Sequence, residues 1–451
     1  MNYSGMNILV VGMARTGLAA AEFLVKRGAR VTINDAQPAS ALGDAVARAA
    51  ASGAAVVVGE HPADLFTRAD LIVISPGVPM SLQPVAEARR RGIPVVGDME
   101  IAFAEMKGRI CAITGSNGKT TTTALTGKIL SDAGLPTVIA GNIGTPLIAM
   151  LDRDSAETWF VCEMSSFQLE ATVELRPRIA SILNVTPDHL DRYDTFGSYA
   201  SAKRRIYEKQ TPEDFLVLNG DDPLLADERP ASSLYYFSRK MEPTQGCFLR
   251  GDVVALSTPR ARGTLMPVHQ IPLKGTHNVE NVMAAALMAL LAGVEMPGIR
   301  KSIEGFRAVS HRLQFVAQIR GVDFFNDSKA TNVDATIKAL ESFPGNIIVI
   351  LGGKDKGGDY GPLAELCRQK VKATILIGQA ADKIASSLAG ACALERASSL
   401  EEAVGRGFDL ATPGDTVLLA PACASFDMFR DFEHRGDVFV SAVTRLKARV
   451  S

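Results

Sequence analysis

The sequence lacks two features that define whole classes of protein: paired cysteines and an excess of charge of one sign. Its six cysteines form no Cys-x-x-Cys pair and no Cys/His cluster with zinc-site spacing, so we expect reduced thiols, a cytoplasmic location and no structural zinc. The 48 Lys and Arg residues balance 49 Asp and Glu residues, which leaves a net charge of −1. Without a general positive field, the chain is not expected to bind nucleic acid.

Long apolar runs are also missing. The longest, from Val282 to Val294, is well short of the roughly 18 residues that a membrane-spanning helix needs. The first residues lack the basic segment and cleavage site of an export signal, so we expect neither export nor a membrane span. A single core stops growing at roughly 250–300 residues. The 451-residue chain therefore predicts several domains, and its 47% apolar content suits α/β proteins.

Strand patterns alternate with helical patterns and divide the chain into three units. Strands are expected at NILVVG, RVTIND, VVVGE, LIVISPG and PVVGD; then at RICAIT, TVIAG, WFVCEMSS, IASILNV and FLVLNG; and finally at VDFFNDS, NIIVILGG, ATILIG and DTVLLAPACAS. Such alternation predicts parallel sheets. The predicted fold class is α/β with three domains: a Rossmann-like domain at 1–97, a central P-loop domain at 98–308 and a second Rossmann-like domain at 309–451.

The segment TGSNGKTT (114–121) lies between an apolar strand and a helical pattern, and it predicts a phosphate site. Glycines let backbone N–H groups approach phosphate oxygens, and a helix N-terminus adds positive potential. Lys119 would supply a point charge and Thr120 a hydroxyl ligand for magnesium. Because Ile113 stands where the general motif has glycine, an ordinary strand–helix turn is the alternative.

A second glycine turn, GMARTG (12–17), is similar to a dinucleotide fingerprint whose middle glycine has become alanine. It predicts a nucleotide diphosphate at the helix N-terminus beside Thr16, with Asp35 near the end of the next strand. A tight turn that only packs the helix on its strand explains the pattern equally well.

Polar positions in the middle unit suggest further ligands, each with a structural alternative. Glu163 ends a strand, where a carboxylate facing a phosphate loop can bind magnesium or be merely solvated. His189 follows another strand, and Lys203 lies in a mixed-charge helix whose default is a solvated face. Asn278 and Asn281 share a helix face at i,i+3 and suit a base edge, although Asn278 could instead cap the helix.

The third unit has clusters of polar residues after three of its strands, at 327–332, 352–357 and 421–427. Open α/β sheets bind ligands at the carboxyl ends of their strands. The clusters therefore predict one binding rim, although Asn, Asp and Gly also favour turns for backbone reasons.

Together these segments resemble the Mur ligase family over essentially the whole chain, and within it the member that adds D-glutamate. The family's phosphate loop is this shortened loop, which explains Ile113. The resemblance implies ATP-dependent joining of D-glutamate to UDP-N-acetylmuramoyl-L-alanine in peptidoglycan precursor synthesis, through an acyl phosphate, with release of ADP and phosphate. A monomer with small-molecule partners is expected. The matching segments are TGSNGKTT, AGNIG, EMSSFQLE, NVTPDHLDRY, AKRRIYE, HNVEN, HRLQ, NDSKATN, LGGKDKG and PACASFDMFRDFEHRG.

The resemblance also implies roles for individual residues. ATP would be bound by Gly115, Ser116, Asn117, Gly118, Lys119, Thr120, Thr121, Asn142, Asn278, Asn281, Arg312 and Asp327. Two Mg²⁺ ions would be held by Thr120, Glu163, His189 and a Lys203 carbamylated by CO₂, and the catalytic set would be Lys119, Glu163, His189 and Lys203. The UDP-substrate would contact Arg15, Thr16, Asn34, Asp35 and Gly77. D-Glutamate would contact Thr331, Lys356, Ser425, Phe426 and Phe432.

Three alternatives remain at this stage: a related ligase such as a folylpolyglutamate synthase, a nucleotide-gated binding protein that hydrolyses ATP, and a nicotinamide oxidoreductase built on the first glycine turn. Because the implied site residues fall in two separate units, we also expect the third unit to close on the second about a hinge near residues 305–312.

Overall fold

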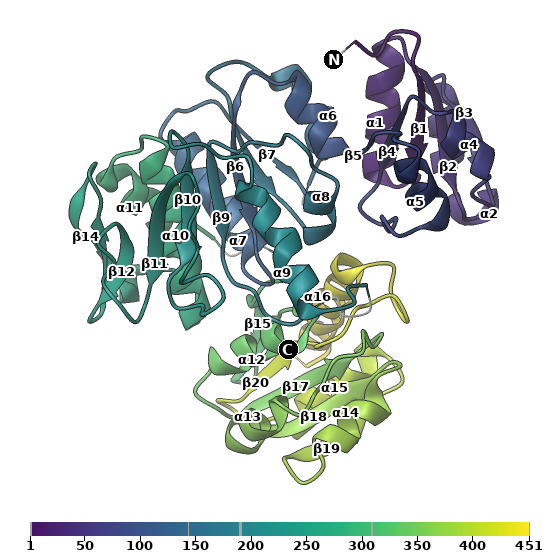
Figure 1. The fold of residues 1–451 in the computed structure, drawn as a ribbon. Coiled ribbons are helices and arrows are strands. Elements are labelled where there is room, and N and C mark those ends of the chain that lie inside the picture. The colour runs from purple at the N-terminus through teal and green to yellow at the C-terminus, as the bar shows by residue number, and fades with distance from the viewer. Residues whose placement is uncertain (1, 143, 189–191, 308–309, 451) are drawn as a thin grey trace.

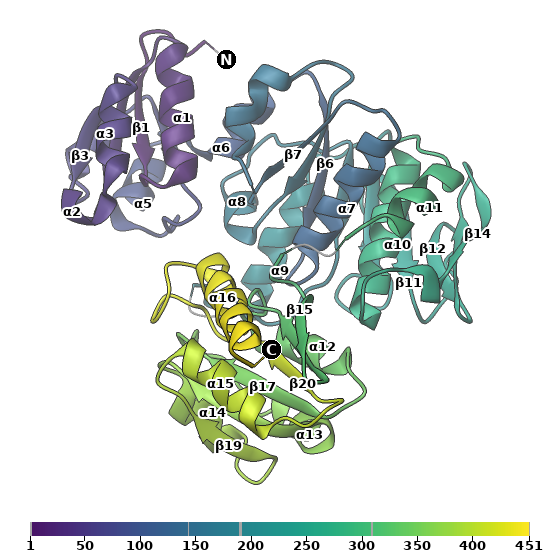
Figure 2. The ribbon, with the colours of Figure 1, turned by 180° about the vertical axis from the view of Figure 1, so that it is seen from behind.

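The structure is a computed structural model that describes residues 2–142, 144–188, 192–307 and 310–450. Its strands form three sheets, one in each of three bodies (Figure 1). Seen from the front and from behind, the third body lies beneath the second, and the first body lies to one side of the second (Figures 1 and 2). Among the described residues, no helix is long and apolar enough to cross a membrane.

The first sheet is entirely parallel, in the order β3-β2-β1-β4-β5, as expected from the strand–helix alternation. Its strands are β1 (Asn7–Val11), β2 (Arg30–Asp35), β3 (Ala55–Val58), β4 (Leu71–Ile74) and β5 (Val95–Gly97). Its helices are α1 (Arg15–Lys26), α2 (Ala39–Leu42), α3 (Asp44–Ala51), α4 (Ala63–Arg68) and α5 (Gln83–Arg90).

The second sheet has the order β14-β13-β12-β11-β10-β9-β6-β8-β7. Its strands are β6 (Arg109–Thr114), β7 (Thr137–Gly141), β8 (Trp159–Glu163), β9 (Ile179–Ile182), β10 (Phe215–Asn219), β11 (Ser233–Ser238), β12 (Gly246–Arg250), β13 (Val253–Ser257) and β14 (Arg262–Pro267). Its helices are α6 (Asp98–Glu105), α7 (Lys119–Asp132), α8 (Ser166–Glu170), α9 (Phe196–Arg204), α10 (Thr276–Leu291) and α11 (Met296–Glu304), with 3-10 turns η1 (Leu147–Arg153), η2 (Arg205–Tyr207) and η3 (Val268–Gln270).

One end of this second sheet differs from the rest. The strands from β7 to β12 are parallel, whereas β13 pairs antiparallel with both β12 and β14. The sequence patterns did not single out the four strands from β11 to β14. The site lies elsewhere, because β6, β8 and β9 are adjacent in the parallel part and their carboxyl ends share one edge.

The third sheet has the order β15-β16-β20-β17-β18-β19. The four expected strands are parallel, and the sequence patterns did not reveal the parallel strand β19 or the antiparallel edge strand β15. The strands are β15 (Gln314–Ile319), β16 (Val322–Asn326), β17 (Ile347–Gly352), β18 (Val371–Ile377), β19 (Ala393–Arg396) and β20 (Thr416–Leu419). The helices are α12 (Val333–Glu341), α13 (Leu363–Lys370), α14 (Ala381–Ser387), α15 (Leu400–Leu410) and α16 (Phe432–Val450).

Apolar packing joins the first two bodies. Met99 and Ala102 of α6 belong to the same buried cluster as Val10 of β1 and Ala112 of β6. The third body has its own clusters on the two faces of its sheet. The predicted domain boundaries stay predictions: residues 97 and 98 lie where β5 gives way to α6, and residues 308–309 lie outside the described residues.

Candidate active site

The phosphate-loop segment connects β6 to α7 and has the backbone that its sequence predicts. Gly115 and Gly118 both have positive φ, 153° and 85°, a region that side chains rarely adopt. A Cβ atom on Gly118 would lie 2.3 Å from the Asn281 side-chain oxygen. Only glycine therefore lets the loop pass this close to α10 while the first turn of α7 presents its free N–H groups.

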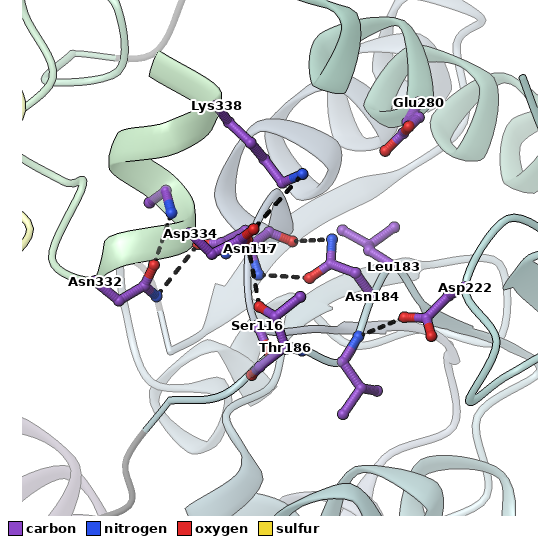
Figure 3. A network of polar contacts seen from close by, with 12 residues as sticks. Ser116, Asn117, Leu183, Asn184, Thr186, Asp222, Glu280, Asn332, Asp334 and Lys338 are labelled. Atoms are coloured by element: carbon purple, nitrogen blue, oxygen red, sulfur yellow. Dashed lines mark hydrogen bonds and ion pairs between the residues drawn. The ribbon is translucent and has the colours of Figure 1, made fainter. Parts of the chain in front are cut away.

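The loop is held in place by the segment that follows β9. Asn184 accepts a hydrogen bond from the Asn117 backbone N–H at 2.8 Å and donates to the Asn117 carbonyl at 3.1 Å. The Ser116 hydroxyl donates to the Thr186 carbonyl and accepts from the Thr186 N–H, both at 2.9 Å. Figure 3 shows these residues meeting at the loop. The conformation of the loop is thus fixed by hydrogen bonds to a different segment of the second body.

Two lysines, Lys203 buried and Lys119 half-buried, share one carbonyl of this loop. Lys119 Nζ donates to the Gly115 and Ser116 carbonyls at 2.8 and 2.9 Å, and Lys203 Nζ donates to the Gly115 carbonyl at 2.9 Å. Burial lowers the pKa of both ammonium groups, and for Lys203 the charge of Lys119 adds to a reduction well below the ordinary value. The alternative of a solvated surface lysine is wrong for Lys203, whose side chain is buried.

Glu163 ends β8 opposite the loop and is also buried. Its carboxylate accepts hydrogen bonds from the Thr120 hydroxyl at 2.8 Å and from the Asn142 amide at 2.7 Å. Burial alone would raise the pKa of Glu163, but the charges of Lys329 and Lys119, together with the hydrogen bonds from Asn142 and Thr120, outweigh burial and hold it below the usual range. The carboxylate is therefore ionised inside the protein, and its alternative as a solvated strand-end group is wrong.

Lys329 reaches this position from the third body and was not among the residues predicted from the sequence. Its Nζ donates to the Thr120 hydroxyl at 2.6 Å and lies 4.7 Å from the centre of the Phe432 ring. Burial lowers its pKa to about 8. The sequence showed Lys329 only as one member of a polar cluster after a strand, because its neighbour in the other body is 209 residues away.

Asn278, Asn281, Arg312 and Asp327 line one small cavity beside the loop, together with Asn117 and Thr121. The cavity holds about 40 Å³, far below the roughly 300–1,000 Å³ of most ligand pockets. Burial raises the pKa of Asp327 to about 6, even though Arg312 lowers it. Arg312 Nε has no hydrogen-bond partner among the described residues.

The two asparagines of α10 are joined to each other. Asn281 donates to the Asn278 side-chain oxygen at 3.0 Å, and Asn278 donates to the Lys274 carbonyl at 2.6 Å. Gly275 occupies the N-cap position of α10. The alternative that Asn278 caps the helix is therefore wrong, and its side chain remains on the cavity face that the i,i+3 spacing predicts.

The three polar clusters of the third body do lie on one rim, because they follow the adjacent strands β16, β20 and β17. Lys356 Nζ lies 3.2 Å from the Asp188 carboxylate of the second body. Asn332 donates to the same carboxylate at 3.0 Å. Ser425 is buried whereas Phe426 is 67% exposed, and Thr331 is half-buried.

These contacts show the third body closed on the second. Lys329, Asn332 and Lys356 all reach side chains of the second body. His189, the remaining predicted metal ligand, lies outside the described residues, directly after Asp188.

In the first body, Arg15, Thr16, Asp35 and Gly77 line a cleft of about 540 Å³, which also includes Asn142 of the second body. Asp35 accepts a hydrogen bond from the Met13 N–H at 2.9 Å. The glycine turn is therefore packed against the next strand, and it also lines the cleft. Arg15 donates to the Gly144 carbonyl across the two bodies at 3.3 Å.

Asn34 is placed differently from the other four residues predicted to contact the UDP-substrate. It is fully buried, and its amide donates to the carbonyls of Val57 and Glu60 at 3.0 and 2.8 Å. Its side-chain oxygen lies 2.6 Å from His61 Nδ1. Asn34 does not line the cleft, whereas His61 does.

Comparisons with known proteins agree with this arrangement. Residues 6–97 match the MurD-like N-terminal domain of Mur ligases, residues 113–289 the Mur ligase middle domain, and residues 311–423 the glutamate ligase domain of Mur ligases.

Two relatives are UDP-N-acetylmuramoylalanine–D-glutamate ligases. That of Acidobacterium capsulatum is 49% identical over 98% of this chain and 97% of its own length, and that of Solibacter usitatus is 48% identical over both full chains. Among solved structures, a pseudomurein peptide ligase of Methanothermus fervidus (TM-score 0.63, 20% identity) covers 98% of this chain and 100% of its own. The UDP-N-acetylmuramate–alanine ligase of Thermotoga maritima (TM-score 0.61, 19% identity) has the same coverage and the same fold. This chain belongs to the Mur ligase family.

Proposed function

We propose that this protein joins D-glutamate to UDP-N-acetylmuramoyl-L-alanine at the expense of ATP, as one step in the synthesis of peptidoglycan precursors. The identity of nearly one half with D-glutamate ligases along the whole chain supports this activity. The observation that carries the proposal is that two different binding sites, one from the second body and one from the third, lie next to each other. The phosphate loop of the second body lies beside a rim of cationic and hydroxyl side chains from the third, since Lys356 of the rim contacts Asp188 in the segment that holds the loop.

The residues beside the loop fit a magnesium ion. Mg²⁺ prefers oxygen ligands, and the Thr120 hydroxyl and the ionised Glu163 carboxylate lie 2.8 Å apart. A bound ion would neutralise charge on the phosphates of ATP. Lys203 would join a second metal site as a carbamate. Burial and the charge of Lys119 lower the pKa of its amine, which favours the neutral form that reacts with CO₂. His189 would complete this second site.

The protein's own groups would act mainly by positioning. Lys119 and the loop N–H groups would hold the β- and γ-phosphates while the γ-phosphoryl group moves to the muramoyl-alanine carboxylate. Asn278 and Asn281 would contact the adenine, and Arg312 and Asp327 the ribose and phosphate region. The first body would hold the UDP portion through the cleft beside Thr16 and the other residues that line it.

The amino acid would bind at the rim of the third body. Lys356, Thr331 and Ser425 would hold the carboxylates of D-glutamate, and Phe426 and Phe432 would wall the site. The amine of D-glutamate would then attack the acyl phosphate. Closure of the third body on the second would keep water away from that reactive intermediate.

Release of inorganic phosphate tests the proposal. Phosphate should appear only when ATP, Mg²⁺, UDP-N-acetylmuramoyl-L-alanine and D-glutamate are all present. The coupled product should be recovered in equal amount. Equal turnover with L-glutamate, or ATP hydrolysis that is indifferent to the acceptor, would overturn the proposal.

A further inference from the structure

The first turn of α12 docks directly on the phosphate loop. Asp334, the second residue of α12, accepts a hydrogen bond from the Asn117 side-chain amide at 2.5 Å. The same carboxylate oxygen lies 3.3 Å from the Thr186 hydroxyl. Figure 3 shows Asp334 projecting from the helix of the third body onto Asn117, with Asn184 on the other side of the loop. One carboxylate therefore contacts both the loop and the segment that fixes the loop.

Asn117 is thereby held from two bodies at once. Its backbone is fixed within the second body by the two hydrogen bonds to Asn184. Among the described residues, its side chain is fixed only through the third body, because the amide donates to Asp334 and the oxygen lies 3.5 Å from the Asn332 amide. When the third body moves away, the side chain of Asn117 loses both of these contacts and the loop loses one of its supports.

The helix geometry suits this contact. Asn332 caps α12 by accepting from the Ala335 N–H at 2.8 Å, which fixes the helix N-terminus beside the loop. An acidic residue in the first turn interacts favourably with the helix dipole. Lys338, one turn later, lies 3.8 Å from Asp334. The carboxylate is therefore preorganised, and its hydrogen bond with Asn117 is charge-assisted, which makes it stronger than a neutral one.

We propose that Asp334 is a positioning residue that couples closure of the third body to the geometry of the phosphate loop. The inference rests on the proposed function, in which the loop holds ATP and the third body holds D-glutamate. Asp334 itself does not line the cavity beside the loop. It stabilises the closed arrangement in which Lys356 and the loop face each other, and it sets the side chain of Asn117 only in that arrangement.

The first test compares three variants. Asp334→Ala removes the acceptor, Asp334→Asn keeps an oxygen acceptor without the charge, and Glu341→Ala removes an exposed carboxylate at the other end of the same helix. With Asp334→Ala we expect kcat/KM for ATP and for D-glutamate to fall about tenfold, since loss of a charge-assisted contact is worth at least one factor of ten. Affinity for the UDP-substrate without nucleotide should be unchanged. Asp334→Asn should be intermediate, and Glu341→Ala should match the wild type.

Other outcomes would overturn the proposal. Wild-type kcat/KM values for Asp334→Ala would show that the contact does not matter in the cycle. A parallel loss of UDP-substrate affinity would show general damage rather than a role in closure. Asp334→Asn behaving no better than Asp334→Ala would show that the acceptor oxygen is not what counts.

Exchanging the two side chains tests the contact between positions 117 and 334 directly. Asn117→Asp places two carboxylates against each other, and adding Asp334→Asn restores one donor and one acceptor with their positions exchanged. Any direct effect of Asn117→Asp on ATP affects both backgrounds and cancels in a double-mutant cycle. We expect Asp334→Asn to raise kcat/KM for ATP several-fold in the Asn117→Asp background, while it lowers the value in the wild type. Strictly additive effects would overturn the coupling.

Failure of the proposed function would remain distinguishable. If the wild type makes no product, the ligase assignment is wrong. The contact can still be tested by solution scattering, which needs no turnover. The unliganded Asp334→Ala protein should have a larger radius of gyration than the wild type and Glu341→Ala, and an unchanged radius would overturn the role of Asp334 in closure.

Discussion

Lys329 of the third body places its ammonium group 2.6 Å from the hydroxyl of Thr120 in the second body. That hydroxyl also donates to Glu163, so the lysine lies where two oxygen groups suited to a magnesium ion converge. Two cations this close repel each other strongly in a buried site. The Thr120 hydroxyl therefore cannot accept a hydrogen bond from Lys329 and coordinate the ion at the same time.

Replacing Lys329 with methionine should separate its two effects. Lys329→Met keeps an apolar stem against Phe432 but removes the charge, so the Mg²⁺ concentration for half-maximal nucleotide binding should fall several-fold. Turnover should fall at least about tenfold, because a cation beside the transferring phosphoryl group is lost. A fluorescent nucleotide titrated at several Mg²⁺ concentrations measures the first effect and phosphate release the second. Lys329→Arg should keep the wild-type Mg²⁺ requirement; an unaltered requirement in the methionine variant contradicts the competition.

The carbamate on Lys203 predicts an unusual order of variants. Lys203→Ala should lose most activity, whereas Lys203→Glu should retain more, because it restores an oxygen ligand of negative charge. Wild-type activity should also fall when dissolved CO₂ is removed and return when bicarbonate is added. Lys209→Ala, at an exposed lysine soon after α9, serves as the control. If Lys203→Ala and Lys203→Glu both match the wild type, Lys203 has no role in metal binding.

Lys356 should affect the amino acid far more than the nucleotide. It lies at the rim of the third body and pairs with Asp188 at 3.2 Å. Lys356→Ala should raise the KM for D-glutamate about tenfold or more, as expected for loss of a charged partner of a carboxylate, and leave the KM for ATP within about twofold. Steady-state kinetics with each substrate varied in turn measures both constants. A larger effect on ATP would place Lys356 at the nucleotide instead.

The buried carboxyl group of Asp98 predicts a pH dependence of stability. Burial raises its pKa from 3.8 to about 7, although the N–H groups at the start of α6 oppose the shift. Between these values the folded form holds a proton that the unfolded chain has lost, so stability decreases as the pH rises through this window. Each pKa unit is worth about 1.4 kcal/mol. Asp98→Asn should therefore stabilise the protein by a few kcal/mol at pH 7 and by much less at pH 4.5.

Urea unfolding at both pH values measures this difference, followed by a probe in the first two bodies because a chain of several domains need not unfold in one step. The matched control is Asp44→Asn, since Asp44 also begins a helix but is exposed. Asp44→Asn should show no pH-dependent gain. An equal gain for Asp98→Asn at both pH values would mean that Asp98 is ionised in the folded protein.

The parts of the site that could be predicted from sequence are local ones. The backbone of the loop from Gly115 to Gly118 follows from its own residues, and the place of Glu163 follows from the end of one apolar strand. Both depend on patterns within a few residues. The antiparallel edge strand β14 was missed because half of it is exposed and it has no clear apolar run, and β13 was missed although its run VVAL is mostly buried.

The residues that could not be predicted act across bodies. Lys329 and Asp334 gain their roles from partners 209 and 217 residues away, in contacts created by how one body sits on another. Asn34 shows the converse: the family resemblance implied a ligand contact, but the carbonyls of Val57 and Glu60 accept hydrogen bonds from its amide. Strand-end position identifies a polar residue near a site, but it does not determine which way the side chain turns.

The small cavity beside the phosphate loop has a kinetic consequence. With about 40 Å³ of space beside the loop, this closed arrangement has no room for a nucleotide there. Every turnover must therefore include at least one opening of the third body. The rate of that opening sets an upper limit on kcat, even if the chemical steps are faster. If opening is the slowest step, kcat should fall as solvent viscosity rises, because viscosity slows the movement of whole domains and leaves phosphoryl transfer untouched.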